Sequence, residues 1–251
     1  MISGEPVILV GLVVAAFPKR PRRALSMWNV RRLDILGTIA TVCFLATPQP
    51  QEPAPGVRLL IERIQDKYQQ TELQARFVQN RLSRLGSVMT TVEGDLYISP
   101  PGRMRWEYST NDQLLIAGGP GREMYLYLPE DNQVQVMQSD FANTSGMPIL
   151  YLSGRGNLLR DFSIQVVEWG APLRRGNVQL ELHPRRSGAS FERLILEVNP
   201  LQEMIVRLVI YDNLRNTLDY QFHDVQFDPG LSEELFEFEI PEGADVIFIE
   251  G

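Results

Sequence analysis

The fold class of this chain follows from two alternating stretches, Val88-Met-Thr-Thr-Val-Glu-Gly-Asp-Leu-Tyr-Ile-Ser99 and Arg103-Met-Arg-Trp-Glu-Tyr108, which are joined by Pro-Pro-Gly. In both stretches an apolar side chain recurs at about every second position, which is the period of a β-strand with one buried face. The Pro-Pro-Gly between them is typical of a turn. Similar alternation is found at residues 72–82, 113–118, 122–128, 133–139, 162–169, 177–183, 191–198, 204–211 and 217–227.

These stretches predict about eleven strands in a mainly β (α+β) protein. The connections between them are too short for the helical crossovers that parallel strands need, so we expect an antiparallel sheet. A sheet of this width has to curl. Apolar residues at helical spacing from Val57 to Tyr68 predict one amphipathic helix before the first strand. The segment Phe141–Arg160 is too apolar for a solvated loop, so we expect short helical turns over the mouth of the sheet, the alternative being an irregular plug of the core.

The N-terminal region stands apart from these patterns. Its two apolar runs, Ile8–Phe17 and Ile35–Ala46, are well below the ~18 residues that a helix needs to cross a bilayer. From Met27 onward, basic residues, an apolar run and a Pro-rich polar segment follow one another, as in a secretory signal. A single loosely anchored segment is the alternative. The expected organisation is residues 1–26 as an upstream extension from an incorrect start, 27–55 as signal peptide and polar linker, and 56–251 as one folded domain.

The composition excludes several functions. The 251 residues include two His and one Cys and carry a formal net charge of −7. Three such residues cannot supply a zinc site, and one Cys cannot form an intrachain disulfide. An acidic chain also lacks the basic surface of a nucleic-acid-binding protein. We therefore expect a protein without metal, cofactor or nucleic-acid partner.

No catalytic constellation is found in the sequence. The chain has no G-x-S-x-G elbow and no Walker A loop, and Gly118-Gly-Pro-Gly121 lies between two expected strands, where it is typical of a turn. We interpret His183 and His223 as structural, because neither has a recognisable nucleophile nearby in the sequence. We expect no catalytic residues and no enzyme.

Four stretches resemble the periplasmic outer-membrane lipoprotein carrier (LolA) family, over roughly residues 57–248. They are Phe77-Val-Gln79, Gly94-Asp-Leu-Tyr-Ile-Ser-Pro-Pro-Gly-Arg-Met-Arg-Trp106, Tyr125-Leu-Tyr-Leu-Pro129 followed by Gln133-Val134, and Phe227-Asp-Pro-Gly-Leu-Ser-Glu-Glu-Leu-Phe-Glu-Phe-Glu-Ile-Pro-Glu-Gly243. The resemblance implies an incompletely closed barrel of eleven antiparallel strands with a helical lid. It also implies a monomeric periplasmic carrier of acylated lipoproteins or related lipids, with an inner-membrane release complex and an outer-membrane acceptor as partners.

One position departs from the family pattern. The resemblance places an Arg that ties the lid to the barrel just before the Pro of the second stretch, and this chain has Pro100 there. Arg103 and Arg105 are the candidate substitutes. Where the family has an inward aromatic residue, this chain has Met104, whose flexible thioether adapts to differently shaped neighbours.

The candidate lipid-binding residues are apolar and alternate along the expected inner face. They are Leu96, Ile98, Met104, Trp106, Met124, Leu126, Val134 and Val136 on strands, and Met147, Ile149, Leu150 and Leu152 in the lid. Periodicity leaves open whether they enclose a hollow or pack into a solid core. Two other functions remain open: a periplasmic lipoprotein sensor or glycolipid-binding protein with the same hollow sheet, and an enzyme acting on a periplasmic ester.

Overall fold

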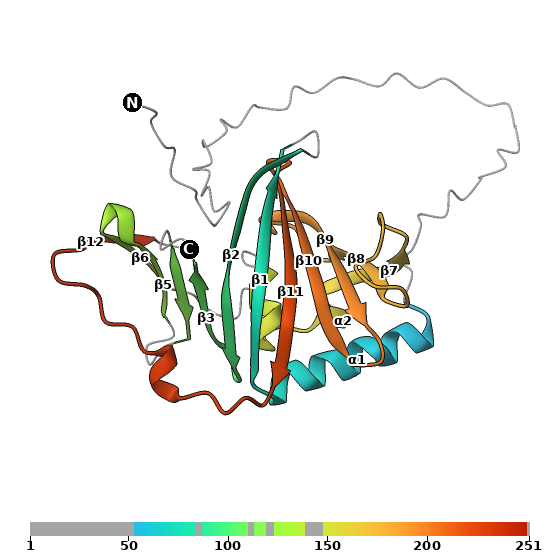
Figure 1. Cartoon of the computed structure of the whole chain (residues 1–251). Helices are drawn as coiled ribbons and strands as arrows, with labels where there is room; N and C mark the ends of the chain where they lie inside the picture. Colours follow the sequence, from blue (N-terminus) through green and yellow to red (C-terminus); the bar gives the residue numbers. More distant parts are fainter. Residues whose placement is uncertain (1–52, 84–86, 110–112, 119–122, 139–147, 250–251) are drawn as a thin grey trace, which may run out of the picture.

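The computed structural model describes residues 53–83, 87–109, 113–118, 123–138 and 148–249 (Figure 1). The interpretations of residues 1–26 and of most of 27–55 therefore lie outside the described residues, as do Met147, residues 141–146 of the expected lid and residues 119–121 of the Gly-rich turn.

The described strands form a single open sheet in the order β12-β6-β5-β4-β3-β2-β1-β11-β10-β9-β8-β7. The strands are β1 (Leu73–Leu82), β2 (Val88–Ser99), β3 (Arg103–Tyr108), β4 (Leu114–Ala117), β5 (Glu123–Leu128), β6 (Gln133–Gln138), β7 (Phe162–Val167), β8 (Val178–Pro184), β9 (Phe191–Asn199), β10 (Met204–Asp212), β11 (Thr217–Phe227) and β12 (Asp245–Ile249). The first eleven are the strands expected from alternation, and neighbours among them pair antiparallel. The fold class is confirmed.

The twelfth strand corrects the expectation of a wholly antiparallel sheet. Strand β12 pairs parallel with β6, with Asp245 opposite Gln133 and Ile249 opposite Met137. Parallel pairing needs a long connection. The chain provides one, because the segment after β11 runs along the sheet to the far edge before β12 begins (Figure 1).

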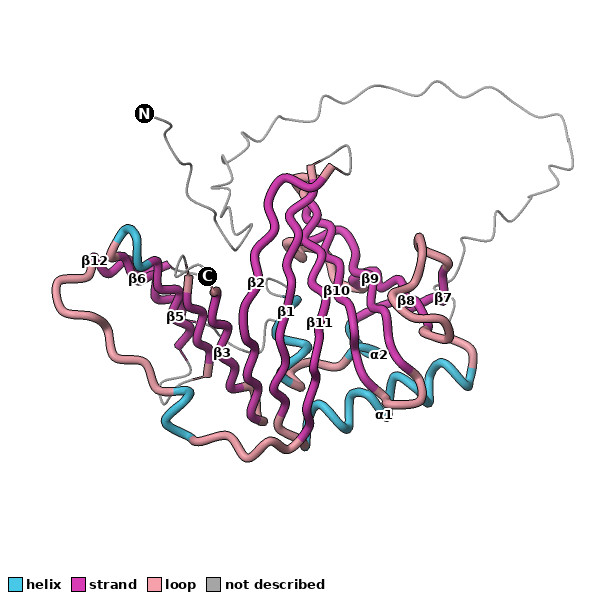
Figure 2. The backbone as a smooth tube through the Cα atoms, viewed as in Figure 1, coloured by secondary structure: helices cyan, strands magenta, loops and turns pink. Residues whose placement is uncertain are grey.

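Helices cover the inner side of this sheet. They are α1 (Pro55–Gln70), the 3₁₀ helix η3 (Pro148–Ser153) and the short α2 (Leu158–Asp161); two further 3₁₀ turns, η1 (Pro129–Asp131) and η4 (Glu233–Phe236), lie in connections. Helix α1 begins with Pro at its first position, where the missing N–H costs no helical hydrogen bond. It crosses one end of the sheet (Figure 2) and buries Ile61, Ile64 and Tyr68. Among the described residues, no helix combines the length and apolar character that a bilayer span requires.

The segment η3 to α2, residues 148–161, is here called the lid segment. It contacts α1 through both of its helices, β2 through η3 and β7 through α2. One apolar core lies between the concave face of the sheet, α1 and the lid segment. The described part of residues 141–160 thus has the helical turns expected from the sequence.

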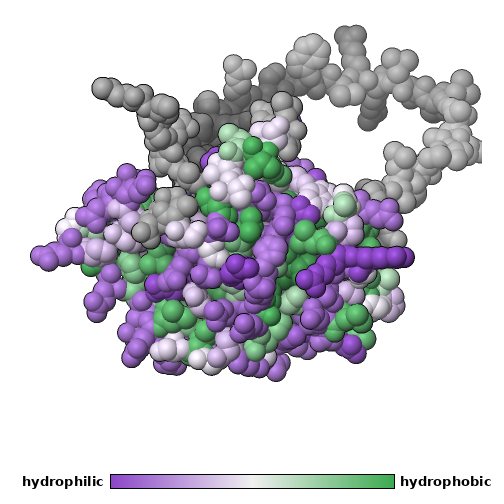
Figure 3. All heavy atoms as spheres, in the orientation of Figure 1, coloured by the Kyte–Doolittle hydropathy of each residue, from purple (hydrophilic) through white to green (hydrophobic). Residues whose placement is uncertain are grey.

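On the face drawn in Figure 3, apolar side chains form small groups. Figure 3 shows hydrophilic side chains over most of the visible face, with apolar ones between them. Leu201, in the β9–β10 turn, is 95% exposed. Scattered exposure of this kind is normal for a folded domain and needs no functional explanation.

The C-terminal segment between β11 and β12 is held to the outer face of the sheet. Arg105 Nη1 donates a 3.0 Å hydrogen bond to the Leu235 carbonyl oxygen. The Arg103 guanidinium lies 5.3 Å from the centre of the Phe236 ring. Further along, the Phe238 ring packs at 5.3 Å from Tyr125. These contacts make residues 233–238 a strap across β3 and β5.

Replacing Phe236 by alanine is expected to loosen this strap. The side chain is buried, so its loss should lower the free energy of unfolding by about 3 kcal/mol, at the low end of the range for core phenylalanines. Urea denaturation followed by circular dichroism measures the change. Glu234→Ala, at an exposed position of the same turn, is the control and should stay within about 0.5 kcal/mol of the wild type. Equal losses for the two variants would contradict the strap.

Candidate functional site

The inner wall of the sheet is continuous from β2 to β5. Leu96 lies opposite Trp106, and Ile98 lies opposite Met104. The same face continues across β4 to two residues of β5, Met124 and Leu126. All six candidate residues on these strands are at most 2% exposed. The structure therefore brings them together on one apolar concave face.

Two candidates lie on the opposite face of the sheet. In the β5–β6 register, Met124 faces Met137, whereas Val136 faces Tyr125 and Val134 faces Tyr127. Since directly opposite residues share a face, Val134 and Val136 point away from Met124 and Leu126. The expectation that they line the inner wall is wrong, and Met137 takes that position on β6. Val134 and Val136 are nevertheless buried, on the face where Phe238 packs against both tyrosines.

The lid segment closes the inner wall with the three described candidates of the second group. Ile149, Leu150 and Leu152 are buried in the same core as the wall residues. Leu152 borders a small apolar cavity with Ile98 of β2 and Leu73 of β1. The segment is therefore a cover whose apolar side chains face the wall.

Two small cavities border the lid segment. The cavity at Leu152 has a volume of about 10 Å³, and a second cavity of about 10 Å³ lies between α1 and the lid segment. Such a volume is close to the minimum for one water molecule. Neither of these two cavities could hold an acyl chain, so a long apolar ligand that binds at either place has to displace the side chains around it.

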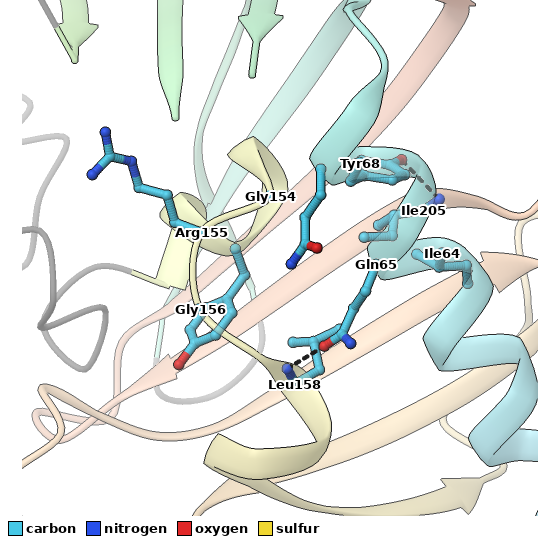
Figure 4. A pocket seen from close by; sticks show the side chains of 10 residues that line it. Ile64, Gln65, Tyr68, Gly154, Arg155, Gly156, Leu158 and Ile205 are labelled. Carbon is cyan, nitrogen blue, oxygen red and sulfur yellow. Dashed lines mark hydrogen bonds between the residues drawn. The ribbon is translucent and has the colours of Figure 1, made fainter. Parts of the chain in front are cut away.

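The lid segment is anchored to α1 at two points (Figure 4). The Leu158 N–H donates a hydrogen bond to Gln65 Oε1. Gly154 has a φ of +74° and approaches the end of α1 so closely that a Cβ there would lie 2.6 Å from the Tyr68 backbone oxygen. Tyr68 in turn accepts a 3.0 Å hydrogen bond from the Ile205 N–H through its hydroxyl. The lid segment, α1 and β10 are thus connected in series.

A third anchor is the arginine between two glycines of the lid segment. Figure 4 shows Arg155 extending away from α1. Its guanidinium occupies the space over Gly102 in the β2–β3 turn, where a Cβ would lie 1.7 Å from Arg155 Nε. The Nε atom is buried. Arg155 therefore joins the lid to the rim of the sheet.

The arginines expected to join lid and barrel have a different role. Arg103 donates to the Ser99 hydroxyl at 2.9 Å and lies 3.5 Å from a Glu233 carboxylate oxygen, and Arg105 binds the strap. Both are on the outer face, so they cannot hold the lid, and that expectation is wrong. Sequence reasoning missed Arg155, although its two flanking glycines, Gly154 and Gly156, marked an unusually close backbone approach.

Polar groups on the inner face were also missed. The Tyr108 hydroxyl donates a 2.7 Å hydrogen bond to Gln79 Oε1, and Tyr220, which is buried, lies opposite Gln79 in the β1–β11 register. Burial raises the pKa of both tyrosines, so they stay protonated at neutral pH. The described residues contain no group of three His, Cys, Asp or Glu side chains placed to hold a metal ion.

An open, curled sheet whose apolar inner face is covered by an N-terminal helix and a short helical lid defines a half-barrel class of fold. The model of the outer membrane lipoprotein carrier protein LolA family matches residues 69–239, and the chain belongs to this family.

The chain is similar to several outer-membrane lipoprotein carrier proteins. It is 28% identical over 213 residues to the one of Nitrosomonas europaea, covering 83% of this chain and 95% of that protein. It is 33% identical over 165 residues to the one of Cupriavidus necator, covering 64% and 73%. Among solved structures, a LolA superfamily protein from Nitrosomonas europaea gives a TM-score of 0.40 at 12% identity, covering 72% of this chain and 97% of that one.

Proposed function

We propose that this protein is a non-enzymatic periplasmic carrier that binds the acyl chains of lipoproteins and transfers them to the outer membrane. The observation that carries the proposal is the apolar inner wall under a lid held by three local anchors. The names of the similar proteins support the same role. In this proposal residues 27–55 direct export, and an inner-membrane release complex and an outer-membrane acceptor are the partners.

The energetics of the cargo explain why such a cover is needed. Three acyl chains of about sixteen carbons expose nearly fifty methylenes, which at about 0.8 kcal/mol each amounts to roughly 40 kcal/mol in water. A carrier has to bury those carbons and still release them. When cargo leaves, Ile149, Leu150 and Leu152 return to the wall, and their burial offsets part of the loss.

The proposed binding wall consists of Leu96, Ile98, Met104, Trp106, Met124 and Leu126, with Met147, Ile149, Leu150 and Leu152 from the lid and its preceding residue. Val134 and Val136 are not part of it. Mass spectrometry of ligands extracted from the purified protein tests the proposal. Acylated peptides are the expected result; free glycolipid would indicate a glycolipid-binding protein, and an absence of any lipid would refute the carrier role.

A charge placed under the lid should prevent loading. Leu152→Glu is expected to lower lipid co-purification at least tenfold, because cargo would bury a carboxylate without a partner. Leu201→Glu adds the same charge at a position that is 95% exposed and should leave co-purification unchanged. Circular dichroism verifies that both variants fold. Equal lipid content in the two variants would remove Leu152 from the site.

A further inference from the structure

Two neighbouring hairpins end together at the end of the sheet that is far from α1. Strand β1 ends at Leu82, which pairs with Val88 at the start of β2 and with Thr217 at the start of β11. The β10–β11 turn, residues 213–216, therefore lies beside the β1–β2 hairpin. Helix α1 crosses the opposite end of these strands (Figure 1).

Three large apolar side chains are exposed at this end. They are Val88 at 58%, Met89 at 65% and Leu214, in the β10–β11 turn, at 57%. Figure 3 shows apolar side chains gathered at the top of the molecule, where Figure 1 draws the ends of these hairpins. Leu201, in contrast, belongs to the turn at the other end of β10. We call Val88, Met89 and Leu214 the apolar tip.

Two basic side chains accompany the apolar tip. Arg81 is the second-last residue of β1, and Arg215 is exposed in the β10–β11 turn. Neither forms an ion pair with another described residue, although the chain as a whole is acidic. Of the two acidic residues at the same level, Glu192 and Asp212, the latter is already engaged, because its carboxylate accepts hydrogen bonds from groups of its own turn. The tip is therefore apolar with available positive charge beside it.

The size and shape of the tip favour a lipid surface over a protein partner. A standard protein–protein interface buries about 800 Å² on each partner, and three partly exposed side chains at the ends of two hairpins offer much less. A bilayer needs no matching surface, because the boundary between headgroups and acyl chains accepts a narrow apolar projection. Arginines beside such a projection are attracted by anionic headgroups.

We propose that the apolar tip docks on the surface of a lipid bilayer that contains anionic lipids. Its three side chains enter the interfacial region, and Arg81 and Arg215 contact lipid phosphates. Helix α1 then lies on the side of the protein that faces away from the membrane. This interaction surface goes beyond the proposed carrier function, because docking requires no cargo.

A fluorescent label at the tip tests this docking directly. In the full chain, Cys43, the only cysteine, is replaced by serine, and Met89→Cys is labelled with an environment-sensitive nitrobenzoxadiazole dye. Vesicles of phosphatidylcholine with about one third phosphatidylglycerol should shift the emission to shorter wavelength, and phosphatidylcholine alone should shift it less. The same label at Leu201→Cys is the matched control. It should not respond to either vesicle, because it lies at the opposite end of β10.

Vesicle co-sedimentation measures what each kind of side chain contributes. Leu214→Glu should weaken binding to the anionic vesicles at least about tenfold, because it removes apolar area and adds a repelled charge. Arg215→Gln should weaken binding about fivefold at low salt, and high salt should remove this difference.

Leu201→Glu is the control for added charge and should bind as the wild type does. It lies roughly 27 Å from the tip along β10, beyond the screening length of about 10 Å in 0.1 M salt. All variants retain residues 1–52, so any contribution of that region is the same in each. Circular dichroism verifies that the variants fold.

The outcomes separate docking from its alternatives. Docking is refuted if the label at Met89→Cys does not respond to anionic vesicles, or if the label at Leu201→Cys responds equally. An emission shift that grows with protein concentration in the absence of vesicles would assign the tip to a contact with a second copy of the chain, and would also overturn the proposal. Because no cargo is present, failure of docking leaves the carrier function standing, and a protein that docks but carries no lipid would refute the carrier function alone.

Discussion

Replacing Gly154 by alanine is expected to detach the lid segment from α1. The residue has a φ of +74°, which costs an L-residue about 1–2 kcal/mol. In addition, the new Cβ would lie 2.6 Å from the Tyr68 backbone oxygen and 2.8 Å from the Gln69 Cα. Backbone atoms of a helix cannot move aside as a flexible side chain can, so the lid has to move.

Hydrogen–deuterium exchange measures this effect directly. A local loss of about 3 kcal/mol corresponds to roughly 100-fold faster exchange of the amides in η3 and α2. Exchange in β9 and β10 should change little, since those strands are buried in the sheet. Faster exchange throughout the chain would show global destabilisation and contradict a local lid.

Gly230→Ala is a matched control for backbone strain. Gly230 has a φ of +76°, almost the same as Gly154, but a Cβ there would meet nothing within 4 Å. The control therefore includes the strain and omits the clash. It should leave exchange in the lid segment at the wild-type rate. If it accelerates the lid as much as Gly154→Ala does, contact between Gly154 and α1 does not hold the lid.

The largest loss of stability is expected for Trp106→Ala. The indole is 1% exposed and lies in the middle of the inner wall. Its ring centre is 4.9 Å from that of Phe77 and 5.5 Å from that of Tyr220. Removing so large a side chain leaves a cavity and should lower the free energy of unfolding by about 4 kcal/mol.

Chemical denaturation gives the value, and Leu201→Ala, at an exposed turn, should change it by less than about 0.5 kcal/mol. Added dioctanoylglycerol should raise the melting temperature of Trp106→Ala more than that of the wild type, because ligand carbons can fill the new space. A loss below about 1 kcal/mol would show that Trp106 is not central to the wall.

The inner face also contains two buried tyrosines, Tyr108 and Tyr220. Because burial raises the pKa of Tyr108 and Tyr220, neither hydroxyl ionises near neutral pH. The hydrogen bond from Tyr108 to Gln79 is therefore present at neutral pH.

The β-strands were predictable from the sequence because their signal is local. Alternation along Val88–Ser99 or Arg103–Tyr108 depends only on the two-residue period of a strand and on one buried face. The amphipathic pattern of α1 is equally local. Strand β12 was missed because Asp245–Ile249 is short and follows a turn-rich tail, and its parallel partner is more than a hundred residues away.

The faces of β6 show where local reasoning fails. Alternation places Val134 and Val136 together, and they are together, but it does not say on which side of the sheet. Both sides of β6 are covered, the inner one by the core and the outer one by the strap near Phe238. With apolar cover on both faces, only the pairing register with β5 assigns each residue to a side.

The sequence by itself determined eleven of the twelve described strands, the opening helix, the family and six of the wall residues, since each of these depends on neighbours in the chain. The tertiary structure alone decided what holds the lid segment and which polar side chains lie on the inner face. Arg155 of the lid segment contacts Gly102 of the β2–β3 turn, although the two are far apart in sequence. Gln79 of β1 likewise lies next to Tyr108 of β3 and Tyr220 of β11. Sequence periodicity cannot predict such contacts, because they form only when the sheet curls and brings distant side chains within hydrogen-bonding or van der Waals distance.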